Sequence, residues 1–294
     1  MGQCRRHLED EYAVVVLGAT IAGVGAAVAA SRTLGRDKVL LLEDSGEIGG
    51  EYLSTYRPVF GLEHCSPADP LARSLLEELR QRRAVIDGIL QPVTLLPVLS
   101  HLLKGSYPLT LYNTRLTGIT TTPLSTGKTG WKLELYQDGV LSALCCAAVF
   151  DTTYHSDSCR SKEELPCQLW FNALVELPES GRDRSWFVQT SADGVSLEPY
   201  AIADYWILRM KLEKDDTALA RDRLFRYWKE RPASMDKAVL VGVASQAERV
   251  FSGIPLRADE GEAKRLLLPE GYASDPIAAL DKGILYMTSL VSDE

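Results

Sequence analysis

Residues 12–25 read "YAVVVLGATIAGVG", and residues 38–50 read "KVLLLEDSGEIGG". The first stretch opens with a continuous run of β-branched and aliphatic side chains, which is typical of a strand buried on both faces of a parallel sheet. The alanine-rich residues 22–34 follow and stop at Gly35, which predicts a helix with a glycine end signal. A second buried strand comes at residues 38–43. Strand, turn, helix and strand within about 30 residues predict a βαβ unit.

The turn between the first strand and the helix reads G-x-T-x-x-G, where a dinucleotide-binding turn reads G-x-G-x-x-G. Gly18 allows a sharp turn, and Gly23 allows the helix to pack closely against the sheet. The N–H groups of the first helical turn then face a pyrophosphate, and the Thr20 hydroxyl is predicted to donate to phosphate as well. Glu43 ends the second strand, where an acid accepts hydrogen bonds from the adenosine ribose and repels a 2′-phosphate. The pattern therefore favours NAD or FAD over NADP.

The next part of the chain predicts two helices and then an antiparallel meander. Helices are expected over residues 67–86, an amphipathic stretch with Pro70 in its first turn, and over residues 92–105. Residues 108–123 and 130–153 alternate like strands, and the Asp-Gly of "QDGV" is a hairpin signal.

The composition changes in residues 161–256, which we interpret as an inserted α+β domain for substrate binding or interaction. Four of the five tryptophans fall there: Trp170, Trp186, Trp206 and Trp228. Residues 274–291 predict a closing helix with Ser274 or Asp275 as its N-cap and Pro276 in its first turn. The predicted fold is α/β, with a Rossmann-like parallel sheet, a meander and the inserted domain. The cofactor-binding domain is then discontinuous, covering residues 1–160 and 257–294.

A Gly-Gly pair, Gly49 and Gly50, follows Glu43, and the meander ends in "AVFDTT" at residues 148–153. With "GATIAGV" at the first turn, the sequence resembles the FAD-dependent oxidoreductases with a glutathione-reductase-type fold, in the branch whose first turn reads G-G-T-P-x-G. The resemblance implies FAD as cofactor. It also implies the site residues, which are Gly18, Thr20 and Gly23 at the pyrophosphate, Glu43 at the ribose, Gly49 and Gly50 beside the flavin, Asp151 and Thr153 at the cofactor cleft, and Asp275 on a closing helix aimed at the flavin. Tyr154 departs from the family pattern, which has glycine there.

The reaction expected from bound FAD is hydride transfer between a small organic substrate and the flavin, with a protein base. His64 and His155 are the candidate bases, and a solvated loop histidine is the alternative interpretation for each. Arg57 is suited to bind a substrate carboxylate or hydroxyl, although a structural ion pair is an equal alternative. The six cysteines form no C-x-x-C pair, and we expect no metal site.

The formal net charge of −8 argues against a nucleic-acid or anionic-membrane partner, because both need a basic surface. No apolar run approaches the roughly 18 residues of a membrane span. We expect a reduced, cytoplasmic protein with a small-molecule substrate, which is either a homo-oligomer or a partner subunit. Two alternatives are a non-catalytic, flavoprotein-like pseudoenzyme or subunit, and an NAD-dependent Rossmann enzyme. The NAD alternative leaves the Gly-Gly segment and the meander without a role.

Overall fold

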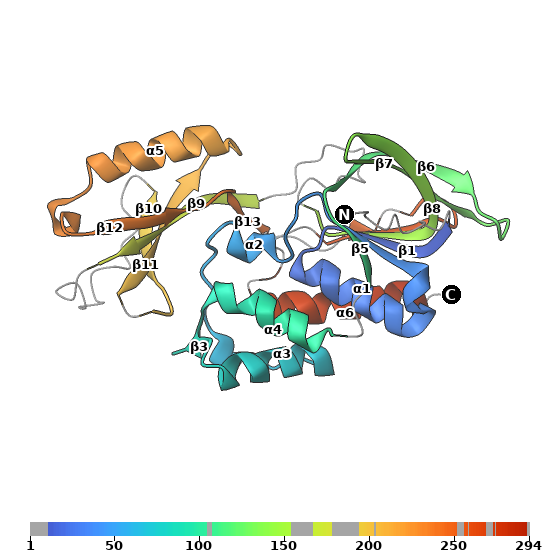
Figure 1. Cartoon of the computed structure of the whole chain (residues 1–294), viewed down its shortest axis with the longest axis horizontal. Helices are drawn as coiled ribbons and strands as arrows, with labels where there is room; N and C mark the ends of the chain where they lie inside the picture. The colour runs from blue at the N-terminus through green and yellow to red at the C-terminus, as the bar shows by residue number, and fades with distance from the viewer. Residues whose placement is uncertain are drawn as a thin grey trace, which may run out of the picture.

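The computed structural model describes residues 11–104, 108–153, 167–177, 194–202, 204–251, 256–257, 259–268, 273 and 275–292. The molecule is elongated and has two lobes, each built around its own sheet (Figure 1). An eight-stranded sheet lies in the lobe on the right of the figure, and a five-stranded sheet lies in the lobe on the left.

Five parallel strands form the centre of the first sheet, in the order β15-β8-β1-β2-β5. These are β1 (Glu11–Leu17), β2 (Val39–Leu42), β5 (Leu109–Leu111), β8 (Val140–Asp151) and β15 (Lys264–Leu267). The short β14 (Leu256–Arg257) pairs antiparallel with β15. The predicted meander is present as β6 (Thr114–Pro123), β7 (Thr129–Gln137) and the first half of β8.

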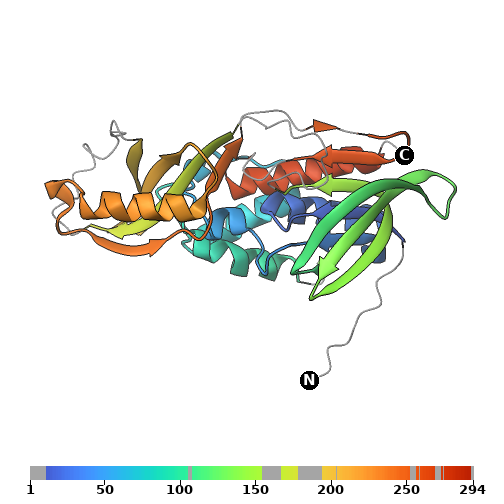
Figure 2. The same ribbon diagram turned by 90° about the horizontal axis from the view of Figure 1, so that it is seen from above.

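Helices cover one face of this sheet and the meander covers the other (Figures 1 and 2). The helices α1 (Ile21–Leu34) and α6 (Pro276–Ser292) lie directly on the sheet, while α3 (Pro70–Gln81) and α4 (Leu95–Leu102) lie further out. Val14 and Val16 of β1 belong to the core beneath the helices, and Val15 and Leu17 belong to the core beneath the meander. Burial on both faces explains the uninterrupted apolar run that predicts this strand.

The helix predicted over residues 67–86 is shorter than expected. α3 ends at Gln81, and Arg83 then adopts a left-handed backbone with φ of +56°. The chain turns at Asp87 and Gly88, both with positive φ, and forms the small hairpin of β3 (Val85–Ile86) and β4 (Ile89–Leu90). Asp-Gly is a hairpin signal. Residues 85 and 86, predicted as the end of the helix, therefore form the first strand of this hairpin.

The second sheet has the order β10-β11-β9-β12, with β13 also paired to β9, and all of its pairs are antiparallel. The strands are β9 (Cys167–Glu176), β10 (Val195–Pro199), β11 (Tyr205–Leu212), β12 (Val239–Val243) and β13 (Glu248–Phe251). Helix α5 (Thr217–Lys229) covers one face, and its Leu224 belongs to the same buried core as Phe171 and Val175 of β9. These strands fall inside the predicted insertion, whose exact boundaries stay a prediction.

The remaining described elements are short. They are α2 (Gly50–Leu53) and the 3-10 turns at Arg36–Lys38, Leu62–His64, Pro92–Thr94 and Ala233–Met235. No helix in the described part of the chain is long and apolar enough to cross a membrane.

Candidate functional site: the turn after the first strand

The turn from β1 into α1 needs both of its glycines. Gly18 has a φ of +88°, and its N–H donates to the Leu42 carbonyl at 2.8 Å, which ties the turn to β2. A Cβ at Gly18 would lie 2.8 Å from Thr152 Oγ1, and a Cβ at Gly23 would overlap the Gly18 carbonyl oxygen. The glycines therefore let the end of β8 and the first turn of α1 come together at the carboxyl end of β1, where ligands bind in open α/β sheets.

Thr20 is the N-cap of α1. Its Oγ1 accepts the Gly23 N–H at 3.0 Å and donates to Thr152 Oγ1 at 2.8 Å. The single hydroxyl proton is thus directed at Thr152. In this arrangement Thr20 orders the turn, and its predicted role as a side-chain donor to phosphate stays a prediction.

Glu43 stands at the end of β2, beside the turn, as the sequence predicts. Its Oε2 accepts the Ala19 N–H at 2.5 Å, and its Oε1 accepts the Ser45 N–H at 2.8 Å and the Ser45 hydroxyl at 2.6 Å. These donors hold the carboxylate at the turn, in the position where a ribose would be recognised. Binding of the ribose itself stays a prediction.

The Gly-Gly segment folds back onto the same turn. Gly49 has a φ of +68°, and its N–H donates to the Ala19 carbonyl at 2.9 Å. A Cβ at Gly49 would lie 2.9 Å from Ile21 Cδ1, so the contact needs glycine. Gly50 begins α2, and a Cβ there would meet nothing closer than 3.8 Å.

Glu51, absent from the predicted site, reaches the N-terminus of α1 itself. Its Oε1 accepts the N–H of Ile21, the first residue of α1, at 2.6 Å, and the residue is only 6% exposed. The available signal was its place directly after Gly-Gly, at the end of the acidic stretch "EDSGEIGGE".

At the end of β8, Asp151 and its neighbours close the other side of the turn. The Asp151 carboxylate is buried and accepts the Thr153 N–H at 2.8 Å and the Thr153 hydroxyl at 2.6 Å. Thr152, absent from the predicted site, donates its N–H to the carbonyl of Leu17 at the end of β1 at 2.8 Å, and its hydroxyl donates to the Gly18 carbonyl of the turn at 3.0 Å.

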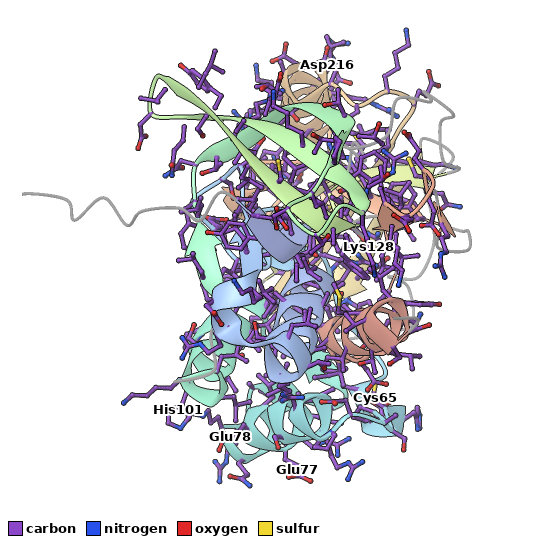
Figure 3. The ribbon with its side chains drawn as sticks, turned by 90° about the vertical axis from the view of Figure 1, so that its right-hand side faces the viewer. Cys65, Glu77, Glu78, His101, Lys128 and Asp216 are labelled. Atoms are coloured by element: carbon purple, nitrogen blue, oxygen red, sulfur yellow. The ribbon has the colours of Figure 1, made fainter. Side chains whose placement is uncertain are left out.

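The closing helix begins near this group. Asp275, one of the two predicted caps, accepts the Ala278 N–H through Oδ1 at 2.8 Å. Burial and the Asp275 carboxylate raise the pKa of the Cys65 thiol, which lies beneath α6 on the side of α3 (Figure 3). Tyr52 of α2 is fully buried, and this burial raises the pKa of its hydroxyl well above its ordinary value.

A comparison with known families identifies the family of the chain. The sequence profile named FAD dependent oxidoreductase matches residues 13–162, just over half of the chain. The chain belongs to this family of FAD-dependent oxidoreductases. No curated protein matches the sequence.

Solved flavoenzymes share the fold of this FAD-dependent oxidoreductase. A p-nitrophenol 4-monooxygenase from Pseudomonas putida is 16% identical, with a TM-score of 0.62 over 97% of this chain and 80% of that one. A glycerol-3-phosphate dehydrogenase from Bacillus halodurans complexed with FAD is 12% identical, with a TM-score of 0.60 over 97% of this chain and 66% of that one. An L-proline dehydrogenase from P. horikoshii is 10% identical, with a TM-score of 0.56 over 98% of this chain and 95% of that one. At such identities the likeness shows the fold alone.

The adenosine end of the site fits the family's cofactor, FAD. The Gly18–Gly23 turn, the start of α1 and Glu43 at the end of β2 stand where the pyrophosphate and the ribose of a dinucleotide are held. When bound, FAD supplies the hydride-accepting flavin. The departure is Glu51, whose carboxylate already accepts a first-turn N–H.

The three predicted catalytic residues are not brought together by the described contacts. Arg57 is 4% exposed, its Nε lies 3.5 Å from Glu248 Oε1, and its NH2 donates to the Ala273 carbonyl at 2.8 Å. These contacts correspond to the ion-pair alternative. The His64 side chain is 84% exposed and lies 3.5 Å from Glu63 Oε1, and His155 lies outside the described residues.

The Arg57 pair belongs to a buried network between the two lobes. Asn172 of β9 donates to the Thr55 carbonyl at 2.9 Å and to Glu248 Oε2 at 2.7 Å. Arg209 of β11 bonds the same Glu248 oxygen at 2.8 Å. The segment that follows Gly-Gly is thereby fixed to the second sheet.

A cavity of about 610 Å³ lies at the opposite end of the first sheet. Its lining includes Glu11, Lys38, Glu262, Lys264 and Lys128, which Figure 3 shows beside the meander. Because ligands of parallel sheets bind at the carboxyl ends of the strands, this cavity is separate from the candidate cofactor site. The described residues contain no cluster of metal-ligating side chains.

Proposed function

We propose that this FAD-dependent oxidoreductase dehydrogenates a small organic substrate at the seam between its two lobes, passing a hydride to the bound flavin. The observation that carries the proposal is the path of residues 49–57. The segment touches the turn through Gly49 and Glu51, and it reaches the second sheet through Arg57, which pairs with Glu248. A ligand that extends from the turn along this segment reaches the seam.

The residues proposed to hold FAD are those of the turn and its surroundings. Backbone N–H groups of the first turn of α1 face the pyrophosphate, and Glu43 accepts from the ribose. Gly49 and Gly50 give room beside the isoalloxazine, while Asp151 and Thr153 close the cleft from β8. The N-terminus of α6, capped by Asp275, is proposed to lie at the flavin.

The substrate side is proposed to be the face of the second sheet that looks away from α5. Arg209 stacks on Trp170, with its Cζ 4.6 Å from the ring centroid, and Asn172 of β9 is fully buried. Asn172 Oδ1 and Arg209 Nε are buried and have no hydrogen-bond partner among the described residues. Buried polar atoms are nearly always satisfied in folded proteins, so these two atoms favour a polar ligand or water at the seam.

The substrate proton that leaves with the hydride needs an acceptor. His64 and His155 are the proposed acceptors. His64 is adjacent in sequence to Cys65, whose thiol contacts the Asp275 carboxylate at the start of α6, so its segment lies at the proposed flavin end. Arg57 is proposed to position this region through its ion pair.

The expected setting of the enzyme is likewise a proposal. Among the described cysteines, Cys65 and Cys146 are free thiols, which supports the proposed reducing, cytoplasmic location. A small-molecule substrate and either self-association or a partner subunit remain the proposed partners.

The test is to purify the protein and record its visible absorption spectrum, with flavin released and identified after denaturation. Bound FAD that is bleached anaerobically by a panel of amino acids, hydroxy acids and amines supports the proposal. Gly18→Val serves as the negative control, because a β-branched side chain does not fit the positive φ of the turn and should prevent FAD binding. A protein that neither carries FAD nor binds it when added would overturn the proposal and favour the non-catalytic alternative.

A further inference from the structure

We propose that Glu51 is an internal anion that occupies the phosphate-binding end of α1, and that FAD displaces its carboxylate on binding. This inference rests on the proposed FAD site and adds the residue that sets its affinity. The side chain would then act as a built-in competitor of the cofactor.

The geometry places two carboxylates of the chain on the turn where a pyrophosphate binds. Glu51 Oε1 lies 2.6 Å from the N–H of Ile21, and Glu43 Oε2 lies 2.5 Å from the N–H of Ala19. Glu43 accepts from the edge of the turn, at the end of β2 where a ribose-binding acid stands. Glu51 instead accepts from the first residue of the helix, which is the donor that an anion at a helix N-terminus uses.

Electrostatic repulsion prevents the Glu51 carboxylate and a pyrophosphate from occupying the N-terminus of α1 together. α1 has 14 residues, and its N-terminus carries the positive end of the helix dipole, which one carboxylate already neutralises in part. The nearby acidic stretch, residues 43–51, contains four carboxylates and no Lys or Arg. A pyrophosphate entering beside Glu51 would therefore lose a donor and meet a like charge in a buried setting.

The local backbone allows this exchange. Gly49 keeps the segment against the turn through its N–H to the Ala19 carbonyl, so Glu51 is held within reach of the helix. Glu51 lies in the single helical turn of α2, and rotation about its side-chain bonds withdraws the carboxylate while the Gly49 contact stays in place.

A matched control exists in the same segment. Glu47 is exposed, and its Oε2 accepts the Ser54 hydroxyl at 2.5 Å rather than a helix N–H. Glu47→Gln removes one charge from the stretch and leaves the N-terminus of α1 unchanged. Glu51→Gln removes the charge and keeps an amide oxygen at the Ile21 N–H, and Glu51→Ala removes both.

The experiment is a titration of flavin-free protein with FAD, followed by quenching of flavin fluorescence, for the wild type and the three variants. We expect Glu51→Gln and Glu51→Ala to bind FAD about tenfold more tightly than the wild type, and Glu47→Gln to bind like the wild type. Thermal unfolding without FAD is the second readout. Glu51→Ala should unfold at a lower temperature because the buried Ile21 N–H loses its acceptor and the helix dipole loses a stabilising carboxylate, while its FAD affinity rises.

Two failures can be told apart. Equal FAD affinity in the wild type and in Glu51→Gln, or weaker binding by Glu51→Gln, would overturn the displacement of Glu51 and leave the proposed function standing. Absence of FAD binding in every variant, with all of them folded, would overturn the proposed function and this inference together.

Discussion

The Oγ1 atoms of Thr20 and Thr152 lie 2.8 Å apart, although 132 residues separate them in the chain. Thr152 Oγ1 also lies 2.9 Å from the Leu17 carbonyl oxygen and 3.0 Å from that of Gly18. One hydroxyl at the end of β8 therefore binds the end of β1, the turn and the cap of α1. The turn after β1 is therefore stabilised by the end of a strand that follows it by more than a hundred residues.

Thr152→Val should lower the free energy of unfolding by about 1–3 kcal/mol, because it leaves buried polar groups of the turn without a partner. Urea denaturation monitored by circular dichroism measures the change. Thr152→Ser keeps the hydroxyl and should stay within about 1 kcal/mol of the wild type. Equal losses in both variants would mean that packing of the methyl group, not the hydroxyl, matters here.

Glu43→Gln should weaken FAD binding about tenfold. The Glu43 carboxylate accepts the Ala19 N–H with one oxygen and the Ser45 N–H with the other. The amide of Gln has only one acceptor oxygen, which would have to serve these donors and the ribose, and it lacks the negative charge. The neighbouring Asp44 is exposed, so Asp44→Asn is the control for loss of one charge. The dissociation constant of FAD is measured for both, and a similar weakening in Asp44→Asn would assign the effect to general charge instead of the ribose position.

The sequence could predict the strand, the turn and the helix that carry the candidate site, because each of them is indicated by consecutive residues. The run before Gly18, the helix that stops at Gly35 and the acid at Glu43 each follow from a few consecutive residues. Glu51 and Thr152 could not be found this way, because their contacts form only when distant segments meet: Glu51 lies 30 residues from Ile21. Arg57 shows the same limit, since its partner Glu248 lies on the second sheet and no local pattern indicates the pairing.

Arg57→Met should destabilise the fold by about 3 kcal/mol, since it removes one cation from a buried carboxylate and a donor from the Ala273 carbonyl. Arg209 still bonds Glu248 in this variant, which keeps the loss at the lower end of the range for buried pairs. Arg82 pairs with Glu78 at 2.9 Å on the surface, and Arg82→Met should change stability by less than about 0.5 kcal/mol. Chemical denaturation measures the free energy of unfolding of both variants. Equal losses would mean that the buried Arg57–Glu248 pair between the lobes stabilises the protein no more than a surface pair does.

The Cys65 thiol should react with iodoacetamide only at a higher pH than an ordinary thiol. Burial and the Asp275 carboxylate raise its pKa, so the reactive thiolate is scarce at neutral pH and appears as the pH rises. Asp275→Asn should shift the pH profile downward, because it removes the nearby negative charge. Alkylation is followed at the Cys65 peptide by mass spectrometry, and an unchanged profile in Asp275→Asn would mean that Asp275 does not contribute to the raised pKa.

Gly283→Ala should loosen the contact between α6 and α1. A Cβ at position 283 would overlap the Ala22 carbonyl oxygen, so the two helices can approach this closely only with glycine at the crossing. Overpacking costs about 1–3 kcal/mol, and the better helix propensity of alanine returns up to about 1 kcal/mol, so we expect a net loss of stability of about 1–2 kcal/mol.

The loss should also reach the cofactor. Ala22 lies in the first turn of α1, directly after Ile21, so a shift of this backbone moves the N–H groups that are proposed to face the pyrophosphate. FAD affinity is therefore expected to fall together with the midpoint of thermal unfolding. Leu285→Ala, on the exposed side of the same helix, should leave both within experimental error, since Leu285 is 64% exposed. A Gly283→Ala protein as stable as the wild type, with equal FAD affinity, would show that α6 does not support the turn.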